Sequence, residues 1–225
     1  MEEWIAYLTG VKAPNRYRLW VNIIEYARAA NFLEVGVFRG DFAQRLLRNC
    51  PSIRRYYMLD PWRHLDEWNK PANVEQNEFD EIYALAMKNT DFARDRRIVL
   101  RGTTVECIDA VPDEDLDIAY IDGDHTLRGI AIDLIRTFSK VKPGGILGGD
   151  DYTKSIWQHG DKYEPSLVCP FANYFAEAHG APLIILPYNQ FAIVKPDQPG
   201  NHFRIVDITG SYGPPSLLRQ MAKRA

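Results

Sequence analysis

Two short segments gather most of the acidic side chains that could do chemistry together. One is DIAYIDGDH at residues 117–125 and the other is KPGGILGGDDY at residues 142–152. Each contains an apolar run typical of a buried strand, so the acids after it should lie at the carboxyl end of that strand. Four acids are expected there on neighbouring strands: Asp122, Asp124, Asp150 and Asp151. Carboxylates this close repel one another and raise each other's pKa unless a cation or donors compensate.

A hard divalent cation is the economical explanation for this group of acids. Oxygen ligands of this kind suit Mg²⁺, Mn²⁺ or Ca²⁺ rather than Zn²⁺. A structural alternative is that Asp150 or Asp151 caps the following turn through bonds to backbone N–H groups. His125 is a candidate base because its ordinary pKa is about 6.5. A lone histidine is more often structural, and here it could cap the helix expected from Thr126 or bond to a neighbouring acid.

A second candidate site begins in the segment LEVGVFRGDFA. An apolar strand runs into Gly36, Gly40 follows four residues later, and Glu34 precedes both. The pattern differs from the GxGxxG of a pyrophosphate-binding turn, because Asp41 stands where its third glycine would be. A ligand without a phosphate group therefore suits this turn better, although both glycines could simply shape a turn and a helix start.

Asp60 ends the next expected strand, 24 residues after Gly36. Dinucleotide-binding folds place an acid at a similar distance to bind ribose hydroxyls, and a carboxylate can accept from both of them. The alternative is a cap or turn before Pro61. Taken with the glycine turn, Asp60 favours a ligand that carries a nucleoside.

The elements that must position these residues follow an α/β pattern, in which short apolar runs alternate with segments of helical spacing. Strands are predicted at residues 31–37, 56–60, 97–100, 117–122 and 145–149, and helices at 16–30, 41–49, 74–92 and 126–140. Residues 183–187 and 190–195 should pair as an antiparallel hairpin. We therefore predict a doubly wound, mostly parallel, seven-stranded sheet (Rossmann-like) that ends in this hairpin.

One domain should hold the whole chain of 225 residues. We divide it into an N-terminal helical segment (1–30) and a cofactor and metal half (31–152). A lid segment with a helix and the closing hairpin (153–200) and a C-terminal tail (201–225) follow. The irregular segments 61–73 and 152–165 both follow strands and should lie above the carboxyl edge of the sheet, where open α/β folds bind ligands.

Composition argues against several classes of partner. A formal net charge of -3 gives no positive field for nucleic acid or an anionic membrane. The cysteines Cys50, Cys107 and Cys169 form neither a CxxC pair nor a Cys/His cluster, so we expect no disulfide framework or zinc site and a reducing, cytoplasmic environment. No secretion signal and no membrane span are predicted.

The order EVGVFRG, LD, RGTTVE, YIDGDH, KPGG and GGDDY resembles the class I S-adenosylmethionine-dependent methyltransferases. More narrowly, it is similar to the bacterial family of macrocin-type sugar O-methyltransferases. The resemblance implies a turn beneath the amino acid portion of the cofactor, built from Glu34, Gly36, Phe38 and Gly40. It implies that Asp60 binds the ribose, that Thr103 and Thr104 lie by the adenine, and that Asp122 closes the pocket.

The same resemblance implies that Asp122, Asp150 and Asp151 bind Mg²⁺ and that Asp124 is the general base, with His125 as its rival. Because a metal would orient two vicinal hydroxyls and lower their pKa, the expected acceptor is a sugar, a diol or a catechol-like small molecule. A catalytically silent cofactor-binding or scaffold domain is the alternative, and a metal-dependent hydrolase lacks a convincing nucleophile. Homo-oligomer formation stays open.

Overall fold

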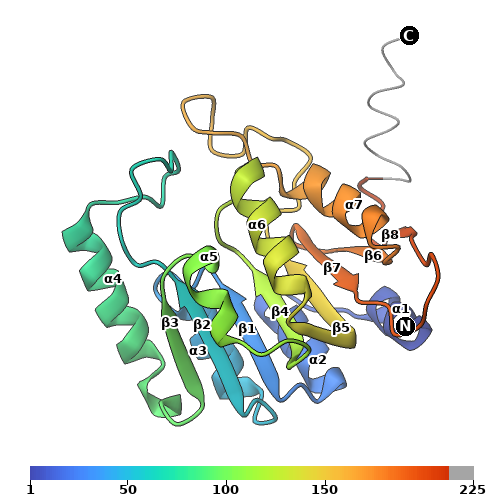
Figure 1. The fold of residues 1–225 in the computed structure, drawn as a ribbon. Coiled ribbons are helices and arrows are strands. Elements are labelled where there is room, and N and C mark those ends of the chain that lie inside the picture. The colour runs from blue at the N-terminus through green and yellow to red at the C-terminus, as the bar shows by residue number, and fades with distance from the viewer. Residues whose placement is uncertain (213–225) are drawn as a thin grey trace.

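An eight-stranded sheet with helices on both faces forms the body of the protein (Figure 1). The computed structural model describes residues 1–212. The strands lie in the order β3-β2-β1-β4-β5-β7-β6-β8, and β7 alone among the described strands runs antiparallel to its neighbours. The strand bounds are β1 Asn31–Val35, β2 Arg55–Asp60, β3 Arg97–Arg101, β4 Leu116–Ile121, β5 Val141–Gly149, β6 Leu183–Leu186, β7 Gln190–Val194 and β8 Ile205–Asp207.

The helices divide between the two faces of the sheet. The first face is covered by α1 (Glu2–Gly10), α2 (Arg16–Ala27), α3 (Asp41–Asn49) and α4 (Gln76–Asn89). The second face is covered by α5 (Thr104–Cys107), α6 (Leu127–Phe138) and α7 (Val168–Ala178). Of two short 3₁₀ turns, η1 (Asp91–Ala93) packs into the first core and η2 (Ile108–Ala110) into the second. Alternate residues of each strand point to opposite faces, which produces two separate cores.

That alternation is clear in β1, where Phe32 packs into the first core and Leu33 into the second. Both cores are built from aliphatic and aromatic side chains, so the central strands are apolar on both faces, as parallel sheets require. The sheet is therefore rigid at its centre, and its carboxyl edge is where polar side chains can gather.

The predicted fold class is confirmed, and the sheet holds one strand more than predicted. The predicted pairing of residues 183–187 with 190–195 is present as β6 and β7, and both turn residues, Tyr188 and Asn189, have positive φ. The additional strand β8 pairs in parallel with β6 at the edge of the sheet. Its three residues fall inside the segment 201–225, which was predicted as a tail, and the part of that tail after residue 212 lies outside the described residues.

No helix among the described residues combines the length and apolar character needed to cross a membrane.

Candidate active site at the carboxyl edge of the sheet

The turn after β1 passes very close to the end of β4. Gly36 has φ 86°, and a Cβ on it would lie 2.0 Å from the backbone oxygen of Asp122. The two strand ends are also joined by the Asp122 N–H, which donates to the carbonyl of Val35 over 2.8 Å. Gly36 is therefore needed for the backbone itself, because any side chain there would push the two strand ends apart.

Asp60 fixes this turn from the neighbouring strand β2. One carboxylate oxygen accepts from the N–H groups of Val37 and Phe38 over 2.9 and 2.8 Å, and the other accepts from Trp62 N–H over 2.8 Å. Burial raises the pKa of Asp60, and the three backbone donors act against that rise. These bonds show that Asp60 fixes the turn after β1. Binding of a ribose by Asp60 stays a prediction.

Glu34 and Gly40 also have partners within the protein. Glu34 is buried on β1 and accepts a 2.7 Å hydrogen bond from the Tyr56 hydroxyl, and burial raises its pKa well above the ordinary value. Gly40, with φ 74°, precedes α3 and lies against Ala86 of α4. Phe38 adopts φ 50° between them. The five predicted residues of this turn are thus brought together around the ends of β1 and β2.

Thr103 and Thr104 begin the short helix α5 beside β3. Thr103 forms a capping box with Glu106, so its side chain serves the helix start. The Thr104 hydroxyl is buried and donates to Asp133 of α6 over 2.5 Å. Burial raises the pKa of Asp133 to about 7. Contact of either threonine with an adenine stays a prediction.

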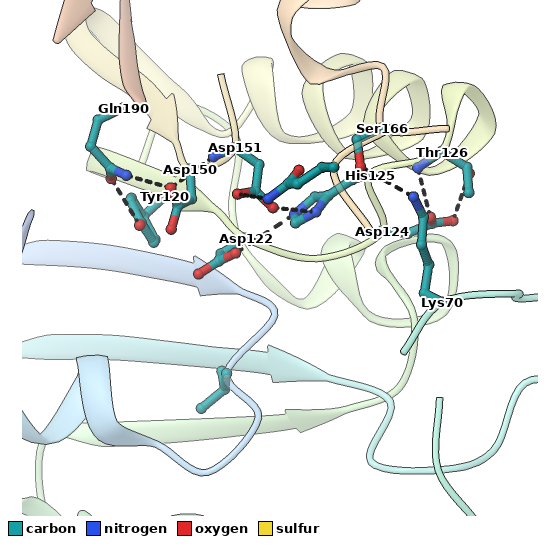
Figure 2. Close-up of polar contacts among 12 residues, drawn as sticks. Lys70, Tyr120, Asp122, Asp124, His125, Thr126, Asp150, Asp151, Ser166 and Gln190 are labelled. Carbon is teal, nitrogen blue, oxygen red and sulfur yellow. Dashed lines mark hydrogen bonds and ion pairs between the residues drawn. The ribbon is translucent and has the colours of Figure 1, made fainter. Parts of the chain in front are cut away.

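The ends of β4 and β5 hold a group of two acids and one histidine (Figure 2). The Asp151 carboxylate bonds the Nδ1 of His125 over 2.7 Å, and Asp122 Oδ1 lies 3.6 Å from His125 Nε2. These three side chains can offer ligand atoms that all lie within 4.8 Å of one another. His125 Nε2 is buried and makes no hydrogen bond to the protein.

Charges within this group shift its pKa values in opposite directions. Burial raises the pKa of Asp122 to about 6, although His125 and Arg16 act against that rise. Burial lowers the pKa of His125, but the bond to Asp151 and the charges of both acids outweigh it and leave the pKa raised. Burial also opposes ionisation of Asp151, yet its bond to His125 holds its pKa below the ordinary value. The His125–Asp151 contact is therefore a strong, charge-assisted pair.

Asp150 is not part of this group, although the sequence predicts it as a metal ligand. One of its oxygens accepts from the Gln190 side chain and from the Asp151 N–H, and the other pairs with Arg16 of α2. Asp150 therefore has partners on both oxygens. His125 was predicted as a base, a helix cap or a partner of a neighbouring acid, and its bond to Asp151 confirms the last of these.

Asp124, the other predicted base, is held beneath the start of α6. It accepts from Trp68 Nε1 over 2.9 Å and from the backbone N–H and hydroxyl of Thr126 over 2.9 and 3.0 Å. A Cβ on Gly129 would lie only 2.1 Å from its carboxyl carbon. Asp124 thus helps to cap the helix and to anchor Trp68 from the first irregular segment.

The two irregular segments are joined to each other by hydrogen bonds, a contact that the sequence did not predict. Buried Lys70 of the first segment donates to the carbonyl of Glu164 over 2.7 Å and to the Ser166 hydroxyl over 3.2 Å. Asn69 adds bonds to Glu164 and Lys162. The aromatic side chains of these segments differ in exposure, because Trp62 and Tyr152 are fully buried while Trp157 is half exposed.

Sequence reasoning missed three polar residues of this region: Arg16, Lys70 and Gln190. Gln190 carried a usable signal, because it is the only amide in the otherwise apolar strand QFAIV. Lys70 stands in a segment without periodicity, and Arg16 begins a helix that precedes the first strand. Their positions depend on loop and helix packing that local sequence does not specify.

A family model described as a methyltransferase domain matches residues 33–152, which is just over half of the chain. This match identifies the domain family and does not extend to the macrocin-type subgroup. No curated protein matches the sequence.

Solved structures share the fold at low sequence identity. An O-methyltransferase from Bacillus cereus in complex with SAH is 18% identical, with 86% of this chain and 87% of that chain covered and a TM-score of 0.54. TomG from Streptomyces achromogenes, an O-methyltransferase of tomaymycin synthesis in complex with SAM, is 16% identical, with 86% and 85% covered and a TM-score of 0.54. A Staphylococcus aureus protein, suggested to be a caffeoyl-CoA O-methyltransferase, is 14% identical, with 85% and 90% covered and a TM-score of 0.58.

Proposed function

We propose that this chain, which belongs to the methyltransferase domain family, is an S-adenosylmethionine-dependent enzyme that methylates a hydroxyl group of a small molecule with the help of a divalent cation. The observation that carries the proposal is the group of Asp122, His125 and Asp151 at the carboxyl edge of the sheet. Its buried, unpartnered His125 nitrogen lies where a ligand in this fold class would bind.

The donor set of this group suits a divalent cation. Asp122 and Asp151 supply carboxylate oxygens of the kind that Mg²⁺ and Mn²⁺ prefer, and we assign the cation to these two acids. When bound, such a cation supplies positive charge that orients vicinal hydroxyls and lowers their pKa. Asp150 was predicted as a third ligand, and its pairing with Arg16 argues against that assignment.

We assign the proton acceptor to His125 rather than to Asp124. His125 Nδ1 is held by Asp151, which orients the ring and leaves Nε2 on the side of Asp122. This is the arrangement of a base and its orienting acid in many enzymes. Three donors already engage Asp124, so taking a proton there would disturb the start of α6.

The cofactor would lie along the ends of β1 and β2. We propose that the turn of Glu34, Gly36, Phe38 and Gly40 lies beneath its amino acid portion, that Asp60 contacts the ribose, and that Thr103 and Thr104 lie towards the adenine. Asp60 supports this, because its three bonds leave one lone-pair position available on the carboxylate. The chemistry then needs only that an acceptor oxygen lie in line with the sulfonium methyl group.

Vicinal oxygens are the expected feature of the acceptor. A sugar, a diol or a catechol-like compound could place one oxygen by Asp122 and another within reach of His125 Nε2. The sugar class comes from the resemblance to the macrocin-type family, and the catechol-like class is in line with the name suggested for the Staphylococcus aureus protein.

A transfer assay tests this proposal. Purified protein is incubated with methyl-labelled S-adenosylmethionine and a panel of catechols and sugar diols, with Mg²⁺ or with EDTA. We expect labelled product from at least one vicinal acceptor and a large loss in EDTA or in Asp151→Asn. Full activity in EDTA would contradict the role of the cation, and methylation of amine acceptors alone would contradict the hydroxyl acceptor.

A further inference from the structure

Arg16 places a cation of the protein itself against the acidic group. It lies outside the residues that match the family, at the first position of α2, where Asn15 caps the helix. Its guanidinium pairs with Asp150 and lies 3.4 Å from Asp122 Oδ2. The side chain passes over the Tyr17 and Phe42 rings, so its direction is fixed by packing as well as by charge.

Gln190 fixes the acid that Arg16 binds. Its side-chain oxygen accepts from Trp20 Nε1 over 2.8 Å and from the Tyr120 hydroxyl over 3.0 Å, so its nitrogen must face Asp150. All of these contacts are buried, and Figure 2 shows the chain from Tyr120 through Gln190 to Asp150. Asp150 is therefore held in place to receive Arg16.

Charge balance shows what this pairing changes. Asp122, Asp150 and Asp151 together carry three negative charges when ionised, and Arg16 offsets one of them. His125, held between Asp122 and Asp151, offsets a further negative charge when it is protonated, so at most two negative charges remain for a divalent cation. Because the guanidinium also faces Asp122, a cation bound there would lie close to a positive charge of the protein.

We propose that Arg16 is a positioning residue that weakens binding of the divalent cation, because its guanidinium faces Asp122 and keeps Asp150 from serving as a third ligand. This inference rests on the metal-assisted function proposed above. With Arg16 in place, only Asp122 and Asp151 are available to the cation. When the cation binds, the Arg16 guanidinium moves away from Asp122. The cation would then bind firmly only where an acceptor adds its own oxygens, which couples metal binding to substrate.

Titration with Mn²⁺ tests this inference without any activity measurement. Free Mn²⁺ is followed by electron paramagnetic resonance in the wild type, Arg16→Gln, Arg16→Met and the control Arg18→Gln. Arg18 is an exposed residue of the same helix, so its substitution removes an equal charge away from the acids. Arg16→Met keeps the apolar stem over the aromatic rings, which guards against a variant that fails to fold.

At low ionic strength we expect both Arg16 variants to bind Mn²⁺ about tenfold more tightly than the wild type, and Arg18→Gln to stay within about twofold. Equal or weaker Mn²⁺ binding in folded Arg16 variants would overturn the inference and leave the proposed function standing. Absence of Mn²⁺ binding in all four proteins would overturn both, so the two failures are distinguishable.

Discussion

Two parts of the same sheet edge treat their acids differently. At the end of β2, Asp60 receives three backbone N–H groups and needs no further partner to be stable. At the ends of β4 and β5, Asp122 and Asp151 face one another across His125, and one nitrogen of that ring makes no hydrogen bond. The acid of the first part is bonded to the backbone, whereas the acids of the second part are held by charged side chains.

This difference separates a part of the edge whose backbone is fixed, around Asp60, from the part where we propose that catalysis takes place, around His125. Backbone donors around Asp60 fix the turn before any ligand arrives, so its geometry is preorganised. Side-chain cations and acids around Asp122 can exchange partners at lower cost, because side chains reorient more easily than backbone. The contrast implies that substitutions in the first part should act on folding and those in the second on catalysis.

The largest effect is expected for His125→Gln. Loss of the proton acceptor should lower kcat by about 10² to 10⁴ fold while SAH binding is kept, because the cofactor turn is untouched. Steady-state transfer rates measure this, with His202→Gln as a control far along the chain. Retention of more than about a tenth of the wild-type rate would remove His125 from the role of base.

Asp133 offers a contrast to Asp60 among the buried acids. It receives one hydrogen bond, from a hydroxyl, whereas Asp60 receives three from backbone N–H groups. The pKa of Asp133 is about 7 in the fold against 3.8 when exposed, so its contribution to stability is present below about pH 4 and is lost as the pH rises through 7. Relative to Asp133→Asn, the wild type should lose up to about 4 kcal/mol of unfolding free energy across that range. Urea unfolding at several pH values measures the difference, and parallel pH profiles for the two proteins would contradict it.

Asp60→Ala should lower the free energy of unfolding by about 3 kcal/mol, because three backbone donors lose their acceptor. Asp151→Asn should cost less than about 1 kcal/mol, since the amide oxygen can still accept from His125. Chemical denaturation of both variants compares the two parts of the edge directly. If Asp151→Asn proved the more destabilising of the two, the distinction between a structural and a reactive part would fail.

The smallest effect is expected for Trp68→Phe, which removes the indole bond to Asp124 and keeps the ring. A loss of about 1 kcal/mol in stability is expected, with the transfer rate within about threefold of the wild type. Thermal unfolding and a rate measurement test this together. A rate loss as large as that of His125→Gln would return Asp124 to the role of base.

Local patterns were sufficient for the fold class and for the order of the main elements, but less so for their boundaries, since β5 begins four residues before its predicted start. The helix predicted at 41–49 is α3 with the same bounds, and β2 begins one residue before its prediction. Strand β8 was missed, since Ile205–Asp207 is too short and lies in a Pro/Gly-rich stretch. The sequence correctly predicted that the acids gather at the carboxyl edge of the sheet. It did not predict which side chain each acid pairs with.

The pairing of the charged side chains at the site could not be predicted from the sequence. Arg16 lies more than a hundred positions from Asp122 and Asp150, so their pairing depends on how α2 packs against the sheet. His125 and Asp124 are neighbours in sequence, yet one enters the acidic group and the other caps α6. Such choices depend on side-chain directions at a strand end, which a sequence pattern does not encode.

Calorimetric titration with SAH and Mg²⁺, on the wild type and Asp151→Asn, tests the central claim most directly. The account predicts saturable SAH binding in both proteins and a Mg²⁺ heat in the wild type that is lost in the variant. Absence of SAH binding in the folded wild type would contradict the assignment as an S-adenosylmethionine-dependent enzyme. An unchanged Mg²⁺ heat in Asp151→Asn would contradict the assignment of the cation to this group.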